Sequence, residues 1–238
     1  MARTIHGFLV FLTLAAAFAL PVQSQTTSEA QSTLRPVILL TGDSLTEQGT
    51  YPKVDGWVAL LQARYTRSTD IITRGLSGYN TKWFLNNPEV HVPIEEFTEN
   101  LREIVRGFQK AAPSAKLLVI TPPHIDDAAR VKYAAQRTDA KRGLVDRSNA
   151  ATAEYAHACV AVANELKVSV LDLYALFNAM TVEARNAMLV DGIHFNVAGN
   201  ELVEKQFRNK LSSDFSALVS SLSTSQFPAA SKYMGEDP

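Results

Sequence analysis

The sequence predicts an α/β fold, a three-layer α/β/α sandwich in which helices cover both faces of a parallel sheet. Short apolar runs that suit buried parallel strands alternate along the chain with longer segments of helical periodicity. Polar segments containing glycine or proline separate them, as in βαβ units. The 238 residues, 46% of them hydrophobic and 20% charged, are enough for one domain of this kind.

Four apolar runs are predicted as strands. They are residues 36–41, 70–73, 116–121 and 168–173, and the third ends at a Pro-Pro pair that cannot continue a strand. Apolar residues at helical spacing predict the helices between and after them. These are residues 57–65, a helix opened by Pro93, a long helix from about 142 to 166 and a last helix from about 197.

The N-terminal segment has the pattern of a signal peptide, predicted for residues 1–24. A basic start precedes the apolar run 7–20, and Val22-Gln23-Ser24 then supplies the small residues of a cleavage site. The run is shorter than the roughly 20 residues of a membrane span. We therefore expect a secreted protein that begins at Gln25 and has no stable membrane span.

The remaining chain divides into three predicted parts. Residues 25–35 are polar and are expected to form a flexible leader, residues 36–222 form the domain, and residues 223–238 form a disordered tail. The net charge of −1 gives no electrostatic support for binding nucleic acid. Cys159 is the only cysteine, so no disulfide within the chain is expected, and its apolar helical context predicts a core residue.

Three polar motifs are candidates for the chemistry. Gly42-Asp43-Ser44 follows the first strand, where a turn into a helix exposes the serine hydroxyl. In Asp191-Gly192-Ile193-His194 the spacing lets the carboxylate reach Nδ1 of the imidazole and leaves Nε2 as a base. Residues 74–81 follow the second strand, and their glycines allow a backbone N–H to approach a ligand. Each motif alone is also typical of an ordinary turn.

Two further interpretations concern metal binding. Asp43, Asp191 and His194 carry carboxylate and imidazole groups that suit a divalent cation, but a metal site would leave Ser44 without a role. The isolated histidines, of which His157 lies within a predicted helix, are interpreted as core or surface residues. They are His91, His124 and His157.

Together the motifs resemble the SGNH (GDSL) hydrolases, and more closely the isoamyl acetate-hydrolysing esterases. Residues 42–48, 74–81, 91–93, 120–123 and 191–194 carry the likeness, which spans residues 36 to about 210. The resemblance implies a flavodoxin-like fold and a small-molecule ester substrate, with no metal or cofactor. It also implies that Ser44 is the nucleophile, His194 its base and Asp191 the orienting carboxylate. The oxyanion hole would use the N–H groups of Ser44 and Gly78.

The chain departs from the family at one motif. The family has Gly-x-Asn-Asp after a central strand, and this chain has no such segment between Thr81 and His91. Asn86 and Asn87 lack the preceding strand and glycine, so the donor role is not assigned to them. We expect one central strand to be lost, with residues 116–121 either pairing with residues 36–41 in a four-stranded sheet or leaving a gap.

Two functions follow from these observations. The first is a serine esterase that hydrolyses short-chain, acetate-type carboxylic esters. The second is a catalytically impaired relative, or the product of a truncated gene model, with a binding role or none.

Overall fold

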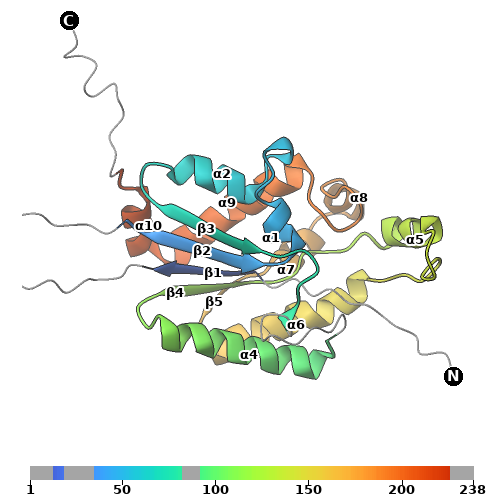
Figure 1. Ribbon diagram of the computed structural model, residues 1–238, viewed down its shortest axis with the longest axis horizontal. Helices are drawn as coiled ribbons and strands as arrows, with labels where there is room; N and C mark the ends of the chain where they lie inside the picture. The colour runs from blue at the N-terminus through green and yellow to red at the C-terminus, as the bar shows by residue number, and fades with distance from the viewer. Residues whose placement is uncertain (1–12, 19–34, 82–91, 226–238) are drawn as a thin grey trace, which may run out of the picture.

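The computed structural model describes residues 13–18, 35–81 and 92–225, which form a sheet of five strands with helices on both faces (Figure 1). The sheet order is β3-β2-β1-β4-β5. The strands are β1 (Thr13–Phe18), β2 (Val37–Gly42), β3 (Asp70–Gly75), β4 (Lys116–Ile120) and β5 (Ser169–Leu171). The pairs β2–β3 and β4–β5 are parallel, and all four predicted strands are present near their expected bounds.

The middle strand of the sheet comes from the segment predicted as a signal peptide. β1 runs antiparallel to both neighbours, and Leu14 pairs with Thr41 of β2 on one side and with Val119 of β4 on the other. The expectation that residues 116–121 would pair with residues 36–41, or that a gap would remain, is therefore wrong. A short apolar segment occupies this place and provides backbone partners for both neighbours. Removal of residues 1–24 on export stays a prediction.

The four helices predicted from the sequence are present, and the structure has further helices that were not predicted. The helices are α1 (Ser44–Gln48), α2 (Trp57–Tyr65), α4 (Ile94–Ala111), α5 (Asp127–Gln136), α6 (Asn149–Glu165), α7 (Leu173–Asn178), α8 (Val182–Asn186), α9 (Val197–Asp214) and α10 (Ser216–Ser223), and Pro52–Val54 form the 3-10 helix η1. The long helix predicted from about residue 142 to 166 is present as α6, but its predicted start is wrong. It begins only at Asn149, because the Ser148 hydroxyl caps it by accepting a hydrogen bond from Ala151 N at 3.1 Å. The separate helix α5, capped by Asp126, was not predicted.

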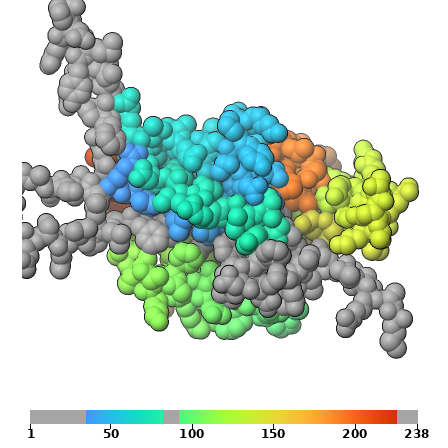
Figure 2. Space-filling model, viewed as in Figure 1, coloured from blue at the N-terminus to red at the C-terminus, as the bar shows by residue number. Residues whose placement is uncertain are grey.

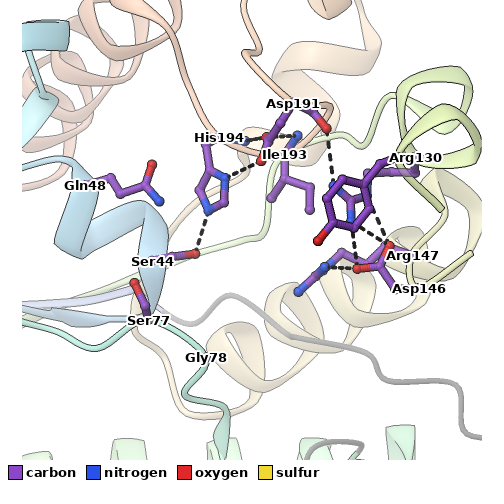
Figure 3. A pocket seen from close by; sticks show the side chains of 11 residues that line it. Ser44, Gln48, Ser77, Gly78, Arg130, Asp146, Arg147, Asp191, Ile193 and His194 are labelled. Carbon is purple, nitrogen blue, oxygen red and sulfur yellow. Dashed lines mark hydrogen bonds and ion pairs between the residues drawn. The ribbon is translucent and has the colours of Figure 1, made fainter. Parts of the chain in front are cut away.

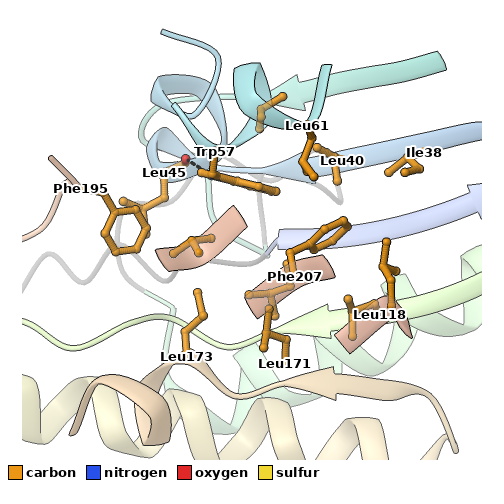
Figure 4. Close-up of a cluster of buried hydrophobic side chains, with 14 of the residues drawn as sticks. Ile38, Leu40, Leu45, Trp57, Leu61, Leu118, Leu171, Leu173, Phe195 and Phe207 are labelled. Atoms are coloured by element: carbon orange, nitrogen blue, oxygen red, sulfur yellow. Dashed lines mark hydrogen bonds between the residues drawn. The ribbon is translucent and has the colours of Figure 1, made fainter. Parts of the chain in front are cut away.

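Two clusters of apolar side chains, one on each face of the sheet, hold the helices against it and give three layers. Helices α2 and α9 pack on one face of the sheet around Ile38, Leu40 and Leu118 (Figure 4). Helices α4 and α6 pack on the other face against Leu117 and Val119. Successive residues of β4 thus enter opposite clusters, because side chains alternate across a strand. In the first cluster Trp57 also donates from Nε1 to Leu45 O at 3.0 Å, which attaches α2 to α1.

The parallel pairs bring their following segments together at one edge of the sheet. Gly42 at the end of β2 pairs with Gly75 at the end of β3, so α1 and the turn of residues 76–80 start side by side. Helix α5 and the loop of residues 137–148 project from one end of the molecule (Figure 2). Within the described ranges, no helix combines the length and the apolar character needed to cross a membrane.

The two predicted terminal segments lie largely outside the described residues. The leader of residues 25–35 contributes only Arg35 to the described part, and the tail of residues 223–238 contributes only residues 223–225. Their predicted flexibility therefore stays a prediction.

Candidate active site

Ser44 lies where β2 passes into α1, at the carboxyl edge of the sheet. It is the first residue of α1, and the Asp43 side chain caps this helix by accepting a hydrogen bond from Leu45 N at 2.9 Å. The cap holds the turn, and the Ser44 side chain lines the pocket described below. This is the strand-to-helix position that the sequence predicts for the serine.

The three side chains predicted as a triad form a continuous hydrogen-bonded chain (Figure 3). His194 Nε2 lies 3.0 Å from Ser44 Oγ, and His194 Nδ1 lies 2.8 Å from Asp191 Oδ2. With the Nδ1–H donating to the carboxylate, Nε2 is free to accept the proton of the serine hydroxyl. The arrangement can therefore activate a hydroxyl nucleophile.

Asp191 is fixed by its own loop. Its Oδ1 accepts hydrogen bonds from the backbone N–H groups of Ile193 at 3.0 Å and His194 at 2.9 Å. Burial raises the pKa of Asp191, but the hydrogen bonds from the side chain and backbone of His194 outweigh it and leave the pKa well below its usual range. The carboxylate is therefore ionised wherever an esterase would work.

Gly78, the predicted second oxyanion donor, lines the same pocket as Ser44. Its φ of +85° is a left-handed conformation that favours glycine, and a Cβ there would meet no atom within 4 Å. The conformation, rather than a lack of space, therefore accounts for glycine at this position.

Glu47 connects the helix that follows the Gly42-Asp43-Ser44 motif with the segment of residues 74–81. The sequence did not predict this contact. Oε2 of Glu47 accepts a hydrogen bond from Ser77 N at 2.6 Å, so α1 holds the residue next to Gly78. The two residues are 30 positions apart, and no spacing rule relates them. Gly75 is required at the same place, because a Cβ there would lie 2.2 Å from Glu47 N.

The pocket has a volume of about 320 Å³, which suits a small molecule. It is lined by Ser44, Gln48, Ser77, Gly78, Arg130, Tyr133, Asp146, Arg147, Asp191, Ile193 and His194. Sequence reasoning missed Arg130 and Tyr133 of α5 and Asp146 and Arg147 of the following loop, since nothing in their local pattern marks a site. Arg130, Asp146 and Arg147 form the side of the pocket opposite α1 (Figure 3).

The other candidates lie away from the triad or outside the description. Burial raises the pKa of Cys159 above its ordinary value, as expected of a core thiol. His157 is exposed, and His124 is fully buried against Phe177. Burial and the charge of Arg185 lower the pKa of His124 to about 4. His91, Asn86 and Asn87 lie outside the described residues.

The metal interpretation finds no support in the described part of the chain. There, no three His, Cys, Asp or Glu side chains are grouped as ligands of one ion. Asp43 is buried within its turn, and burial raises its pKa well above the ordinary value.

The sequence is similar to those of known proteins. A profile of the GDSL-like lipase/acylhydrolase family matches residues 85–202. A GDSL esterase/lipase of Arabidopsis thaliana is 34% identical over 203 residues, which cover 71% of this chain and 83% of the relative. An isoamyl acetate-hydrolyzing esterase 1 homolog of Rattus norvegicus is 31% identical over 209 residues, covering 74% of this chain and 81% of the relative.

Solved structures share the fold at low sequence identity. A lipase/acylhydrolase from Enterococcus faecalis superposes with a TM-score of 0.54 and 19% identity, covering 74% of this chain and 94% of its own. The acetyl xylan esterase AlAXEase gives a TM-score of 0.52 and 18% identity, covering 70% of this chain and 95% of its own. The predicted fold class is thus confirmed, with one antiparallel strand inserted in the sheet.

Proposed function

Because the chain belongs to the GDSL-like lipase/acylhydrolase family and is a carboxylic ester hydrolase, we propose that it cleaves short-chain, acetate-type esters with Ser44 as nucleophile. The observation that carries the proposal is the hydrogen-bonded chain from Ser44 through His194 to Asp191 at the wall of a small pocket. The isoamyl acetate-hydrolyzing relatives support acetate-type esters as the substrate class.

The proposed reaction uses the three hydrogen-bonded side chains in turn. Ser44 Oγ attacks the ester carbonyl while His194 Nε2 takes its proton, giving a tetrahedral intermediate. Collapse of the intermediate breaks the ester C–O bond, and His194 returns the proton to the departing alcohol. Water then attacks the acyl-enzyme with His194 again as base, which releases the carboxylic acid and restores Ser44. Asp191 keeps the imidazole in the required tautomer and stabilises its protonated form.

The oxyanion of each intermediate needs donors that are already in place. We assign this role to the backbone N–H groups of Ser44 and Gly78, which belong to segments that start side by side at the sheet edge. The contact from Glu47 to Ser77 supports the position of the second donor.

A second candidate function is a catalytically impaired protein. The observation that favours it is the missing Gly-x-Asn-Asp segment, because the loss of one oxyanion donor costs on the order of 10²–10³ in rate. Turnover of p-nitrophenyl acetate near an ordinary enzymatic rate, roughly 10 s⁻¹, would exclude impairment. If turnover is far lower, insertion of the relatives' helix–strand–Gly-x-Asn-Asp segment between Thr81 and Pro88 should raise it at least about a hundredfold.

The test of the main proposal is ester hydrolysis by purified protein with acetate and butyrate esters. We expect hydrolysis that favours the shorter acyl chain and that disappears in Ser44→Ala. Equal hydrolysis by the variant would contradict the assignment of the nucleophile. We also propose that the protein is secreted, on the strength of its N-terminal sequence pattern alone.

A further inference from the structure

The wall of the pocket opposite α1 holds two guanidinium groups and one carboxylate. Arg130 Nη2 donates to both oxygens of Asp146 at 2.8 Å, and Arg147 donates from Nη1 to the same carboxylate. The cluster of these three residues, called the arginine wall below, thus contains one more positive than negative charge.

The guanidinium of Arg130 uses its hydrogen-bond donors in contacts within the protein. Besides Asp146, it donates from Nη1 to the backbone O of Asp191 at 3.3 Å, and its guanidinium lies 4.1 Å from the centre of the Tyr133 ring. Only 3% of its side chain is exposed. Arg130 is therefore a structural cation that holds α5, Asp146 and the triad loop together.

Among the residues that the structure describes, most of the hydrogen-bonding capacity of Arg147 is unused. The hydrogen bond from Nη1 to Asp146 is its one contact of this kind among the described residues, and its Nε has no partner there. Figure 3 shows its guanidinium pointing into the pocket, toward the side where Ser44 and Gly78 lie. The other acidic residue of the pocket, Asp191, is already bound by His194 and two backbone N–H groups.

We propose that Arg147 is a specificity residue that binds a carboxylate on the substrate, so that the pocket prefers esters carrying one negative charge. A guanidinium edge matches a planar carboxylate with two parallel hydrogen bonds, and the half-buried position of Arg147 limits competition from water. This inference rests on the proposed function, since it names the class of ester that the same site selects.

The experiment compares pairs of esters in which a carboxylate is replaced by a neutral carboxamide of similar shape. On the alcohol side the pair is 4-acetoxybenzoate and 4-acetoxybenzamide, and on the acyl side it is the 4-nitrophenyl monoesters of glutarate and glutaramate. For each pair the ratio of kcat/KM, charged over neutral, is measured in the wild type, Arg147→Gln, Arg147→Lys and Arg142→Gln. Arg142 is the matched control, because it is an exposed arginine of the same loop that does not line the pocket.

We expect the charged ester of at least one pair to be preferred by about ten- to a hundredfold, mainly through KM. Arg147→Gln should remove the preference, Arg147→Lys should keep part of it, and Arg142→Gln should retain it. Higher salt should weaken it in the wild type. A wild-type ratio near one for both pairs, or a preference that is unchanged in a folded Arg147→Gln, would overturn the inference while leaving the esterase proposal standing.

A binding measurement separates this inference from the proposed function. If no ester is hydrolysed, the proposed function fails, and calorimetric titration of the Ser44→Ala protein with 4-acetamidobenzoate and 4-acetamidobenzamide still tests Arg147. Tighter binding of the charged amide that is lost in Ser44→Ala/Arg147→Gln would support the inference. Equal binding of the two amides would overturn it.

Discussion

The backbone N–H of Ser77 donates to the Glu47 carboxylate at 2.6 Å, and this bond ties the turn that carries Gly78 to the helix that begins at Ser44. The proposed nucleophile and the proposed second oxyanion donor are thus held by one side chain. If the turn moved by about 1 Å, a donor would leave the position in which it can stabilise the intermediate.

Loss of the Glu47 carboxylate should lower kcat more than it raises KM. Glu47→Ala is expected to reduce kcat about ten- to a hundredfold, because an oxyanion donor acts mainly on the transition state. Glu47→Gln keeps an acceptor for Ser77 N and should retain more activity. Steady-state kinetics on a neutral acetate ester would check this, and a kcat for Glu47→Ala equal to that of the wild type would show that the turn holds its position without the bond.

Ser44 should be the residue that a fluorophosphonate probe labels. Ser44→Ala should abolish the labelling and lower ester hydrolysis by on the order of 10⁴-fold or more. Ser212→Ala, at an exposed serine of α9, serves as the control and should behave as the wild type. Mass spectrometry of the labelled peptide gives the site, and a label on any other serine would contradict the assignment.

Asp191→Asn should leave the protein folded but nearly inactive. The amide would favour the wrong imidazole tautomer, so kcat is expected to fall by about 10³–10⁴-fold while KM changes little. The matched control is Asp214→Asn, at the far end of α9, where the carboxylate pairs with Lys210 at 2.9 Å. Kinetics at several pH values would check this. A small loss in Asp191→Asn would mean that the loop backbone alone orients His194.

Stability should fall as the pH drops from about 6.5 to about 4, and His124 should cause part of the fall. Its pKa is lowered from 6.5 to about 4 in the folded protein, so in this window the unfolded chain takes up a proton that the folded chain does not. The contribution is up to about 3 kcal/mol, with no loss above the window. Urea unfolding of the wild type and His124→Leu would show it as a flatter pH profile in the variant. Replacement of the exposed His157 by Gln is the control, and equal slopes for the wild type and His124→Leu would contradict the prediction.

A chain that starts at Gln25, the predicted product of signal cleavage, should be less stable than the full chain. It lacks β1, so the backbone N–H and C=O groups of β2 and β4 that pair with β1 in the full chain lose their partners. Urea unfolding of the two chains would measure the difference. In the full chain, Ala16→Pro should reproduce part of the loss, because proline removes an N–H from the middle of the sheet. Identical unfolding curves for all three proteins would show that β1 contributes nothing to stability.

The sequence predicts the parts of the site that lie in local motifs. Spacing alone relates His194 to Asp191, three residues before it, whereas the resemblance to the SGNH hydrolases implied that Ser44 acts with them. Glu47 and Arg147 have no such mark, since their importance comes from contacts between segments far apart in the chain. Helix α6 begins later than the sequence predicts because the Ser148 hydroxyl caps it, although the pattern of residues 142–148 is also compatible with a helix.

The strand β1 was not predicted for a different reason. The apolar core of a signal peptide and a buried central strand have the same composition, so Thr13–Phe18 is consistent with either role. The strand role depends on pairing partners that are 19 to 27 residues away in β2 and about 100 residues away in β4, so no local pattern indicates it.

The central position of β1 also divides the sheet into two parallel pairs, β2–β3 and β4–β5, that can form separately. β2 and β3 pair within one short stretch of chain, and so do β4 and β5, but the ladders between these halves run through β1. Pairing within each half brings together strands that are close in the sequence. Joining the halves requires β1, near the start of the chain, to pair with β4, which lies about 100 residues later. During synthesis of the full chain, β1, β2 and β3 are therefore made before β4, and the edge of β1 that pairs with β4 has no partner until β4 is made.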